Sequence, residues 1–130
     1  MILIEVGGAT IEVPNFERNE FDCRCGCGFN NVKDMFLWRL QFARTEAQMP
    51  FIVNSGCRCP KHNASKRVGG KPDSDHLKGE AADIKVSNSS ERWRVVNAAI
   101  NAGFRRIGIG DGFVHLGVNW SNPQNVMWLY

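Results

Sequence analysis

The chain lacks a long hydrophobic run, since no apolar stretch in its 130 residues approaches the roughly 20 that a membrane-spanning helix needs. It also lacks a basic, continuously apolar amino terminus, because Glu5 and the pair Gly7-Gly8 interrupt the first residues. We therefore expect no secretory signal there, and we expect synthesis in the cytoplasm. Action outside the cell would then require lysis or another release route.

A strong charge of one sign is also missing. The formal net charge is only +3, and the Lys and Arg residues are spread along the chain, so the charge gives no case for nucleic-acid binding. A small positive charge would still allow the protein to approach an anionic polymer such as a cell wall. Hydrophobic residues make up 43% of the chain and charged residues 22%, which is typical of a soluble globular protein. We expect one domain over residues 1–130, acting as a monomer.

Hydrophobic patterning predicts an α+β fold, with helices on one side of a small, mainly antiparallel sheet. Residues 2–6 and 9–13 alternate around Gly7-Gly8 and predict a β-hairpin, appended within residues 1–14. The predicted helices cover residues 32–48, 60–68 and 89–102. The predicted strands cover residues 51–54, 83–86, 105–110 and 113–118. We expect Trp93 to lie in the core and residues 126–130 to pack on it.

The stretch from Ser74 to Asp83 carries the most chemistry. On one straight helix, His76 and Asp83 would lie about 10 Å apart, but they can converge if Gly79 turns the chain and Asp83 opens a strand. A second strand carries His115 between Val114 and Leu116, and two neighbouring strands would bring the three side chains together. Two neutral imidazoles and one carboxylate are a ligand set that zinc accepts, with a fourth position left for water.

Taken one at a time, these residues have a simpler interpretation. Each histidine would be a hydrogen-bonded core residue, and Asp83 would be a cap or an ion-pair partner. The joint occurrence is the stronger signal. The sequence here resembles the zinc D-Ala-D-Ala carboxypeptidases and their phage and bacterial endopeptidase relatives. These peptidoglycan-cleaving enzymes are peptidases of the M15 type, subfamily A. They share their fold with the hedgehog signalling domain.

The resemblance runs from about Phe21 to the end of the chain. Its most specific part is the pattern Ser-x-His-x-x-Gly-x-Ala-x-Asp, which is met by Ser74, His76, Gly79, Ala81 and Asp83. Residues 55–63, 113–116 and 122–130 also resemble segments of those proteins.

The resemblance implies that His76, Asp83 and His115 are zinc ligands. It also implies that Arg58 binds the substrate carboxylate or the developing oxyanion, for which a planar, bidentate guanidinium is suited. Ser74 would hydrogen-bond around the ligand loop, although a plain turn residue is an equal alternative. The expected reaction is zinc-assisted hydrolysis of a D-amino-acid-containing amide in a peptidoglycan stem peptide. Zinc would polarise the carbonyl, and an acid would take the proton of the attacking water.

Two departures from the resemblance concern the acids near His115. Many relatives carry an acid two residues after the third ligand, where this chain has Gly117, and several carry a catalytic acid three residues before it, where this chain has Gly112. Asp111 is the nearest candidate for the general base, and a simple turn aspartate is the alternative. Glu80 is a weaker substitute. These departures leave open a non-catalytic binding domain or a phage structural domain on the same fold.

Five cysteines fall in two clusters, one at Cys23, Cys25 and Cys27 and the other at Cys57 and Cys59. An odd number cannot all pair within one chain. Cys-x-Cys is not the usual spacing of a zinc knuckle, so a pair of disulfides or buried thiols is our preferred interpretation, with a second, structural metal site as the alternative. Either arrangement would fix Arg58, because Cys57 and Cys59 flank it.

Overall fold

The computed structural model describes residues 1–130. The helices are α1 (Asp34–Ala47), α2 (Pro60–Ala64) and α3 (Ser89–Asn101), with short 3₁₀ helices η1 (Arg18–Phe21) and η2 (Asp75–Lys78). The strands are β1 (Ile2–Val6), β2 (Ala9–Val13), β3 (Val53–Ser55), β4 (Ala81–Lys85), β5 (Arg106–Ile109), β6 (Phe113–Gly117) and β7 (Val126–Leu129). No helix is long and apolar enough to cross a membrane.

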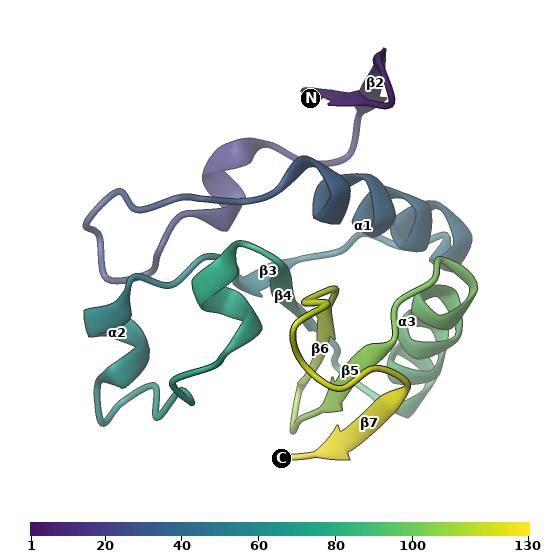
Figure 1. Ribbon diagram of the computed structural model, residues 1–130. Coiled ribbons are helices and arrows are strands. Elements are labelled where there is room, and N and C mark those ends of the chain that lie inside the picture. Colours follow the sequence, from purple (N-terminus) through teal and green to yellow (C-terminus); the bar gives the residue numbers. More distant parts are fainter.

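Five strands form the main sheet in the order β3-β4-β6-β5-β7. Every neighbouring pair is antiparallel except β5 and β7, which run parallel. The α+β prediction is therefore confirmed. Figure 1 shows α1 and α3 side by side against this sheet, with α2 and η2 near the start of β4.

The two faces of the sheet differ in character because side chains alternate along each strand. On β4 and β6, Ala82, Ile84, Val114 and Leu116 are fully buried and belong to the hydrophobic core shared with α1 and α3. Asp83 and His115 alternate with these residues and so lie on the opposite face of the sheet. The helices cover the apolar face, and the polar face is left for a functional site.

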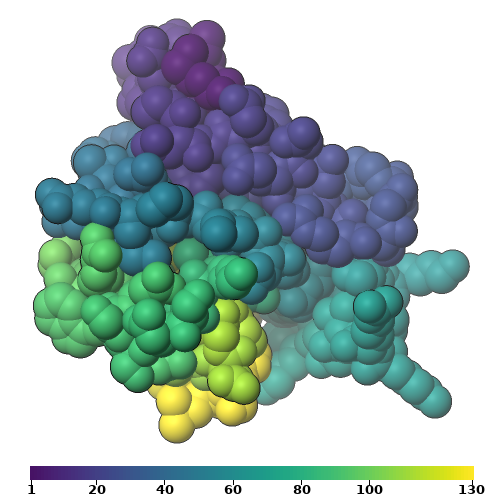
Figure 2. Space-filling model, turned by 180° about the vertical axis from the view of Figure 1, so that it is seen from behind, coloured from purple at the N-terminus to yellow at the C-terminus, as the bar shows by residue number.

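The N-terminal hairpin forms as the alternation predicts, with Ile2 opposite Val13 and Gly7 and Gly8 at the turn. Ile2, Ile4 and Val13 are buried and extend the core. Figure 2 shows the molecule from behind, with the hairpin (purple) at one end and the C-terminal segment (yellow) at the other.

The structure corrects three local expectations. Helix α2 ends at Ala64, four residues before the predicted end at Val68, because Ser65 is extended and its backbone carbonyl accepts a bond from Gly69 N–H. Trp93 is 67% exposed, and the buried face of α3 is formed by smaller residues such as Val95 and Ala99. Asp83 lies in the middle of β4, since the strand begins two residues earlier, at Ala81.

Candidate metal centre

The turn that carries His76 is fixed by its two ends. Ser74 caps η2, because its hydroxyl oxygen accepts a bond from the His76 backbone N–H at 3.3 Å. Gly79 ends the turn in the left-handed region with φ 69°, and a Cβ there would collide with the Asn31 carbonyl. Only glycine fits this position, so Gly79 is needed to return the chain into β4. The result is a buried His76 beside the start of that strand.

Asp83 and His115 meet because β4 and β6 are neighbours in the sheet, although a helix and β5 separate them in the sequence. The two residues are directly opposite one another in the antiparallel register. Oδ1 of Asp83 lies 3.1 Å from Nδ1 of His115 and 3.2 Å from Nε2 of His76. All three residues are buried. The structure therefore brings together the three residues that the sequence nominated as ligands.

The hydrogen bonds of the two rings show what this cluster is built to hold. Nδ1 of His76 donates its proton to the Gly56 carbonyl at 2.7 Å, so Nε2 faces Asp83 without a proton and without a hydrogen-bond partner. Nε2 of His115 likewise lies 3.1 Å from a carboxylate oxygen of Asp75, which leaves Nδ1 directed at Asp83. The lone pair of His76 Nε2 and a carboxylate oxygen of Asp83 converge, and neutral His115 with its proton on Nε2 adds a second lone pair from Nδ1, so that a cation satisfies all three. The donor set fits zinc.

Without a bound ion, the buried groups of the cluster shift one another's pKa values. Burial would raise the pKa of Asp83, but the hydrogen bond with His115 and the adjacent His76 ring outweigh it and hold that pKa well below its usual range. Burial lowers the pKa of His76. For His115, burial acts in the same direction, yet the flanking carboxylates of Asp75 and Asp83 raise its pKa overall. The carboxylate of Asp83 is thus ionised and ready to bind a positive ion.

A cavity of about 700 Å³ opens over the cluster. Arg58 forms part of its wall, and its guanidinium is held by Ser55 Oγ at 3.3 Å, by Asn63 Oδ1 at 3.3 Å and by Asp83 Oδ2 at 3.5 Å. Ser74 lines the cavity from η2. Trp128 and Tyr130 form an aromatic wall, and Trp128 lies over Gly108, where a Cβ would be too close to its ring. The predicted substrate-binding residues therefore border one space with the predicted ligands.

A family model described as Peptidase M15 matches residues 14–117. The chain belongs to the peptidase M15 family. The matched segment contains η2, β4 and β6, and so all three residues of the cluster. No curated protein matches the chain. Membership in the M15 family supports a peptidase of the metallopeptidase class.

Asp75 is a residue of this M15 protein that sequence reasoning missed. Its buried carboxylate accepts from Arg106 Nε at 2.9 Å and from Asn122 Nδ2 at 3.1 Å, and it holds Nε2 of His115. Such a carboxylate fixes the tautomer and orientation of a metal-binding histidine. Burial raises the pKa of Asp75, but its bonds to His115 and Arg106 lower it to about 2.

The position of Asp75 also explains Gly117. A Cβ at residue 117 would collide with the Asp75 carboxylate and would lie 3.1 Å from Nε2 of His115. The space that a side chain two residues after His115 would enter is therefore filled by an acid from η2. A signal was present in the sequence, because an acid directly precedes His76 and a glycine stands where many relatives carry an acid.

The structure does not bring Asp111 to the cluster. Asp111 lies exposed in the turn between β5 and β6, outside the residues that line the cavity. Glu80, the weaker candidate, is partly buried, and burial raises its pKa, but it does not line the cavity either. The assignment of Asp111 as general base stays a prediction. A third carboxylate, that of Asp73, does line the cavity.

Proposed function

We propose that this M15 family member is a zinc metallopeptidase that hydrolyses a D-amino-acid-containing amide bond in peptidoglycan stem peptides, acting on the wall after release from the cell. The observation that carries the proposal is the convergence of His76 Nε2, His115 Nδ1 and Asp83 Oδ1 on one point, with separations of 3.1 and 3.2 Å to the carboxylate oxygen. No proton-donating group faces the buried Nε2 of His76.

In this proposal, His76, Asp83 and His115 hold the zinc ion. When bound, zinc supplies a Lewis acid that polarises the amide carbonyl and lowers the pKa of water. Arg58 faces the same cavity and presents a guanidinium that is already oriented by Ser55 and Asn63. Its charge and fork geometry suit either the terminal carboxylate of a stem peptide or the oxyanion that forms during hydrolysis.

Hydrolysis also needs a group that takes a proton from water and returns one to the leaving amine. Two carboxylates compete for this role. Asp111 is favoured by its place near His115 in the sequence, and Asp73 by its place in the cavity wall. Separate Asp111→Asn and Asp73→Asn variants decide between them, because the base is the residue whose loss lowers kcat while zinc content stays unchanged.

The test is cleavage of purified peptidoglycan fragments, followed by mass spectrometry of the products. We expect activity to vanish after chelation, to return with zinc, and to be absent in His76→Ala. His62→Ala is the matched control, because His62 lies on α2 outside the cluster, and it should retain activity. Cleavage that survives both chelation and His76→Ala would overturn the proposal. The product masses also show whether the bond is terminal or lies within a cross-bridge.

A further inference from the structure

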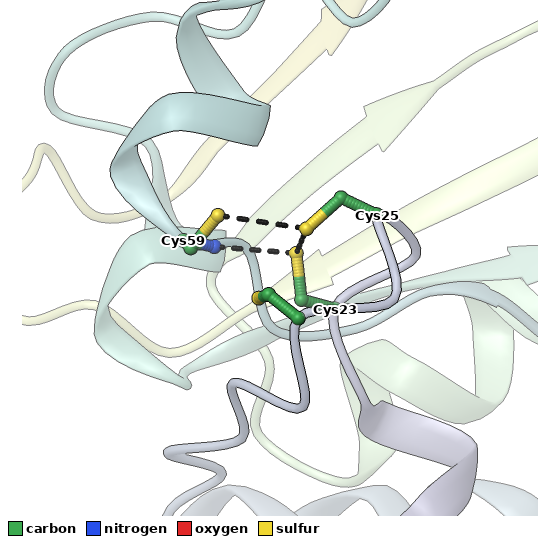
Figure 3. A group of neighbouring side chains, drawn as sticks. Cys23, Cys25 and Cys59 are labelled. Atoms are coloured by element: carbon green, nitrogen blue, oxygen red, sulfur yellow. Dashed lines mark hydrogen bonds between the residues drawn. The ribbon is translucent and has the colours of Figure 1, made fainter.

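Four of the five cysteines gather at a place separate from the His76 cluster. Cys23, Cys25 and Cys27 come from the loop between η1 and α1, and Cys59 comes from the start of α2. Their four sulfur atoms lie within 4.8 Å of one another. Figure 3 shows the sulfurs of Cys23, Cys25 and Cys59 directed toward one another from the two chain segments. The loop and the start of α2 thus meet at these sulfur atoms.

The separations suit one tetrahedral ion. The Cys23 and Cys25 sulfurs are 3.5 Å apart, and those of Cys25 and Cys59 are 3.8 Å apart. Thiolates bound to one zinc ion at about 2.3 Å in a tetrahedron have their sulfurs about 3.8 Å apart. All five cysteines of the chain are free thiols in the structure. The spacing therefore suits a set of metal ligands, which is the alternative to the disulfides or buried thiols that we preferred from the sequence.

Backbone N–H groups around the cluster point at the sulfurs. Cys59 N–H donates to the Cys23 sulfur, His62 N–H to the Cys59 sulfur and Phe29 N–H to the Cys27 sulfur, each at 3.4 Å. A charged acceptor makes such a bond stronger, so this shell favours thiolates.

The loop is also shaped for the short Cys-x-Cys spacing. Gly26 and Gly28 both have φ 83°, in the left-handed region, and these bends turn alternate residues back toward one point. Between two of the cysteines, Arg24 donates to backbone carbonyls of Glu20, Asp22, Val53 and Asn54, which ties the loop to β3. The usual knuckle spacing is therefore not needed here.

Crowding of the sulfurs has an electrostatic consequence. Burial raises the pKa of Cys23, but backbone and thiol hydrogen bonds outweigh it and lower the pKa to about 7. Its neighbour behaves oppositely, because hydrogen bonding to the Cys27 side chain raises the pKa of Cys25 to about 12. These opposite shifts follow from the short distances between the sulfurs, and the distances are the observation that points to a common ion.

We propose that Cys23, Cys25, Cys27 and Cys59 bind one structural zinc ion, in a second metal centre distinct from the His76 cluster. Each thiol releases its proton to solvent as its sulfur binds the ion, so no oxidant is involved. Cys59 is adjacent to Arg58 and caps α2 through its sulfur. The ion therefore ties the loop at residues 23–27 to the turn that presents Arg58 to the cavity.

This second centre is tested by metal content and cobalt spectroscopy, without a peptidase assay. Reduced, zinc-loaded wild-type protein should carry an ion in each centre. Cys25→Ser and Cys27→Ser, which alter exposed residues, should lose the cysteine-bound ion and keep the other. Cys57→Ser is the matched control, because Cys57 lies outside the cluster and its sulfur bonds Asn30 Oδ1 at 3.7 Å, a bond that a hydroxyl can replace. It should keep both ions.

A second measurement uses the chain without any cysteine change, so that it does not depend on the folding of a cysteine variant. His76→Ala loaded with cobalt(II) should show the strong thiolate-to-cobalt charge-transfer absorption, and adding zinc should abolish it. Absence of that absorption would overturn the second centre, as would unchanged zinc content in Cys25→Ser. So would mass spectrometry that finds Cys25 or Cys59 in a disulfide in freshly isolated protein. Failure of the peptidase proposal would appear instead as missing activity, with the cysteine-bound ion still present.

Discussion

The two clusters of potential ligands are built in opposite ways. His76, Asp83 and His115 are buried, and two of them are cross-strand partners in the centre of the sheet. Three of the four cysteines lie in one loop, and Cys25 and Cys27 are exposed. The first cluster inherits its geometry from a rigid register, whereas the second needs its ion to hold two segments together. We therefore expect metal loss to cost activity at the first cluster and local order at the second.

The largest effect is expected for Asp83→Asn. The substitution keeps the shape of the side chain but removes the charge that faces both histidines and Arg58. We expect zinc to be lost from this centre and kcat/KM to fall by about 10³-fold or more, which is about 4 kcal/mol of transition-state stabilisation. Zinc content and peptidoglycan cleavage should be measured together.

Asp34→Asn is the control for that variant, because Asp34 forms an exposed ion pair with Arg18 and does not line the cavity. It should leave both quantities unchanged. Full zinc content in Asp83→Asn would show that the sheet register does not build a metal centre.

A smaller loss is expected for Arg58→Lys. Lysine retains the positive charge but cannot reproduce the fork that reaches Ser55, Asn63 and Asp83 together. We expect kcat/KM to fall by about 10²-fold with zinc content unchanged. Arg67→Lys, an exposed residue on the loop after α2, provides the matched control. Equal activity in the two variants would remove Arg58 from the substrate-binding role.

Asp75→Asn tests whether His115 depends on its carboxylate partner. The amide can still accept from the ring N–H, but it does not carry the charge that makes the imidazole a better ligand. We expect zinc affinity to fall by between about 10-fold and 100-fold. A purely structural role would instead lower thermal stability and leave the zinc affinity of the folded protein unchanged. Competition with a chelator of known affinity separates the two.

The same variant has a pH signature in the metal-free protein. The pKa of Asp75 is about 2 in the folded chain, below the value of about 3.9 for an unfolded aspartate. Its contribution to stability is therefore present above about pH 4 and is lost as the pH falls through about 2. Denaturant melts between these pH values should show a weaker pH dependence for Asp75→Asn. An identical dependence in both proteins would contradict the assigned pKa.

The smallest effect on catalysis is expected for Cys25→Ser. This exposed residue lies outside the cavity, so we expect only a few-fold loss of kcat/KM, caused by a looser Arg58 turn. The melting temperature should fall by several degrees in the zinc-loaded protein, since a lost ion no longer stabilises the folded state. Amide exchange should increase over residues 23–29 and 57–60. Unchanged exchange there would show that the cysteines do not link the two segments.

Much of the candidate metal centre could be predicted because motif and strand pattern agree. The turn at Gly79 and the two apolar strands predicted that Asp83 and His115 would meet, and the structure places them opposite one another. For Asp75 the sequence held only a weak signal, the acid directly before His76, because its role depends on the side chains of Arg106 and Asn122 that approach its carboxylate. For the cysteines, the sequence offered a structural metal site only as the alternative, because the Cys-x-Cys spacing does not show that Cys25 and Cys59, 34 residues apart, approach one another.

Elsewhere, local sequence patterns were not enough to predict which side chains the fold buries. Spacing alone placed Trp93 in the core, yet α3 buries only its narrow face of Val95, Ala98 and Ala99 against the rest of the molecule. The choice of general base depends on how a substrate lies in the cavity, and this is what the Asp111→Asn and Asp73→Asn variants report.

The most direct test of the His76 centre is anomalous X-ray diffraction at the zinc edge from crystals of the zinc-loaded protein. We expect a peak about 2.0–2.2 Å from Nε2 of His76, Nδ1 of His115 and a carboxylate oxygen of Asp83. A fully loaded crystal with no peak among these three residues, whether or not one appears among the cysteines, would contradict it.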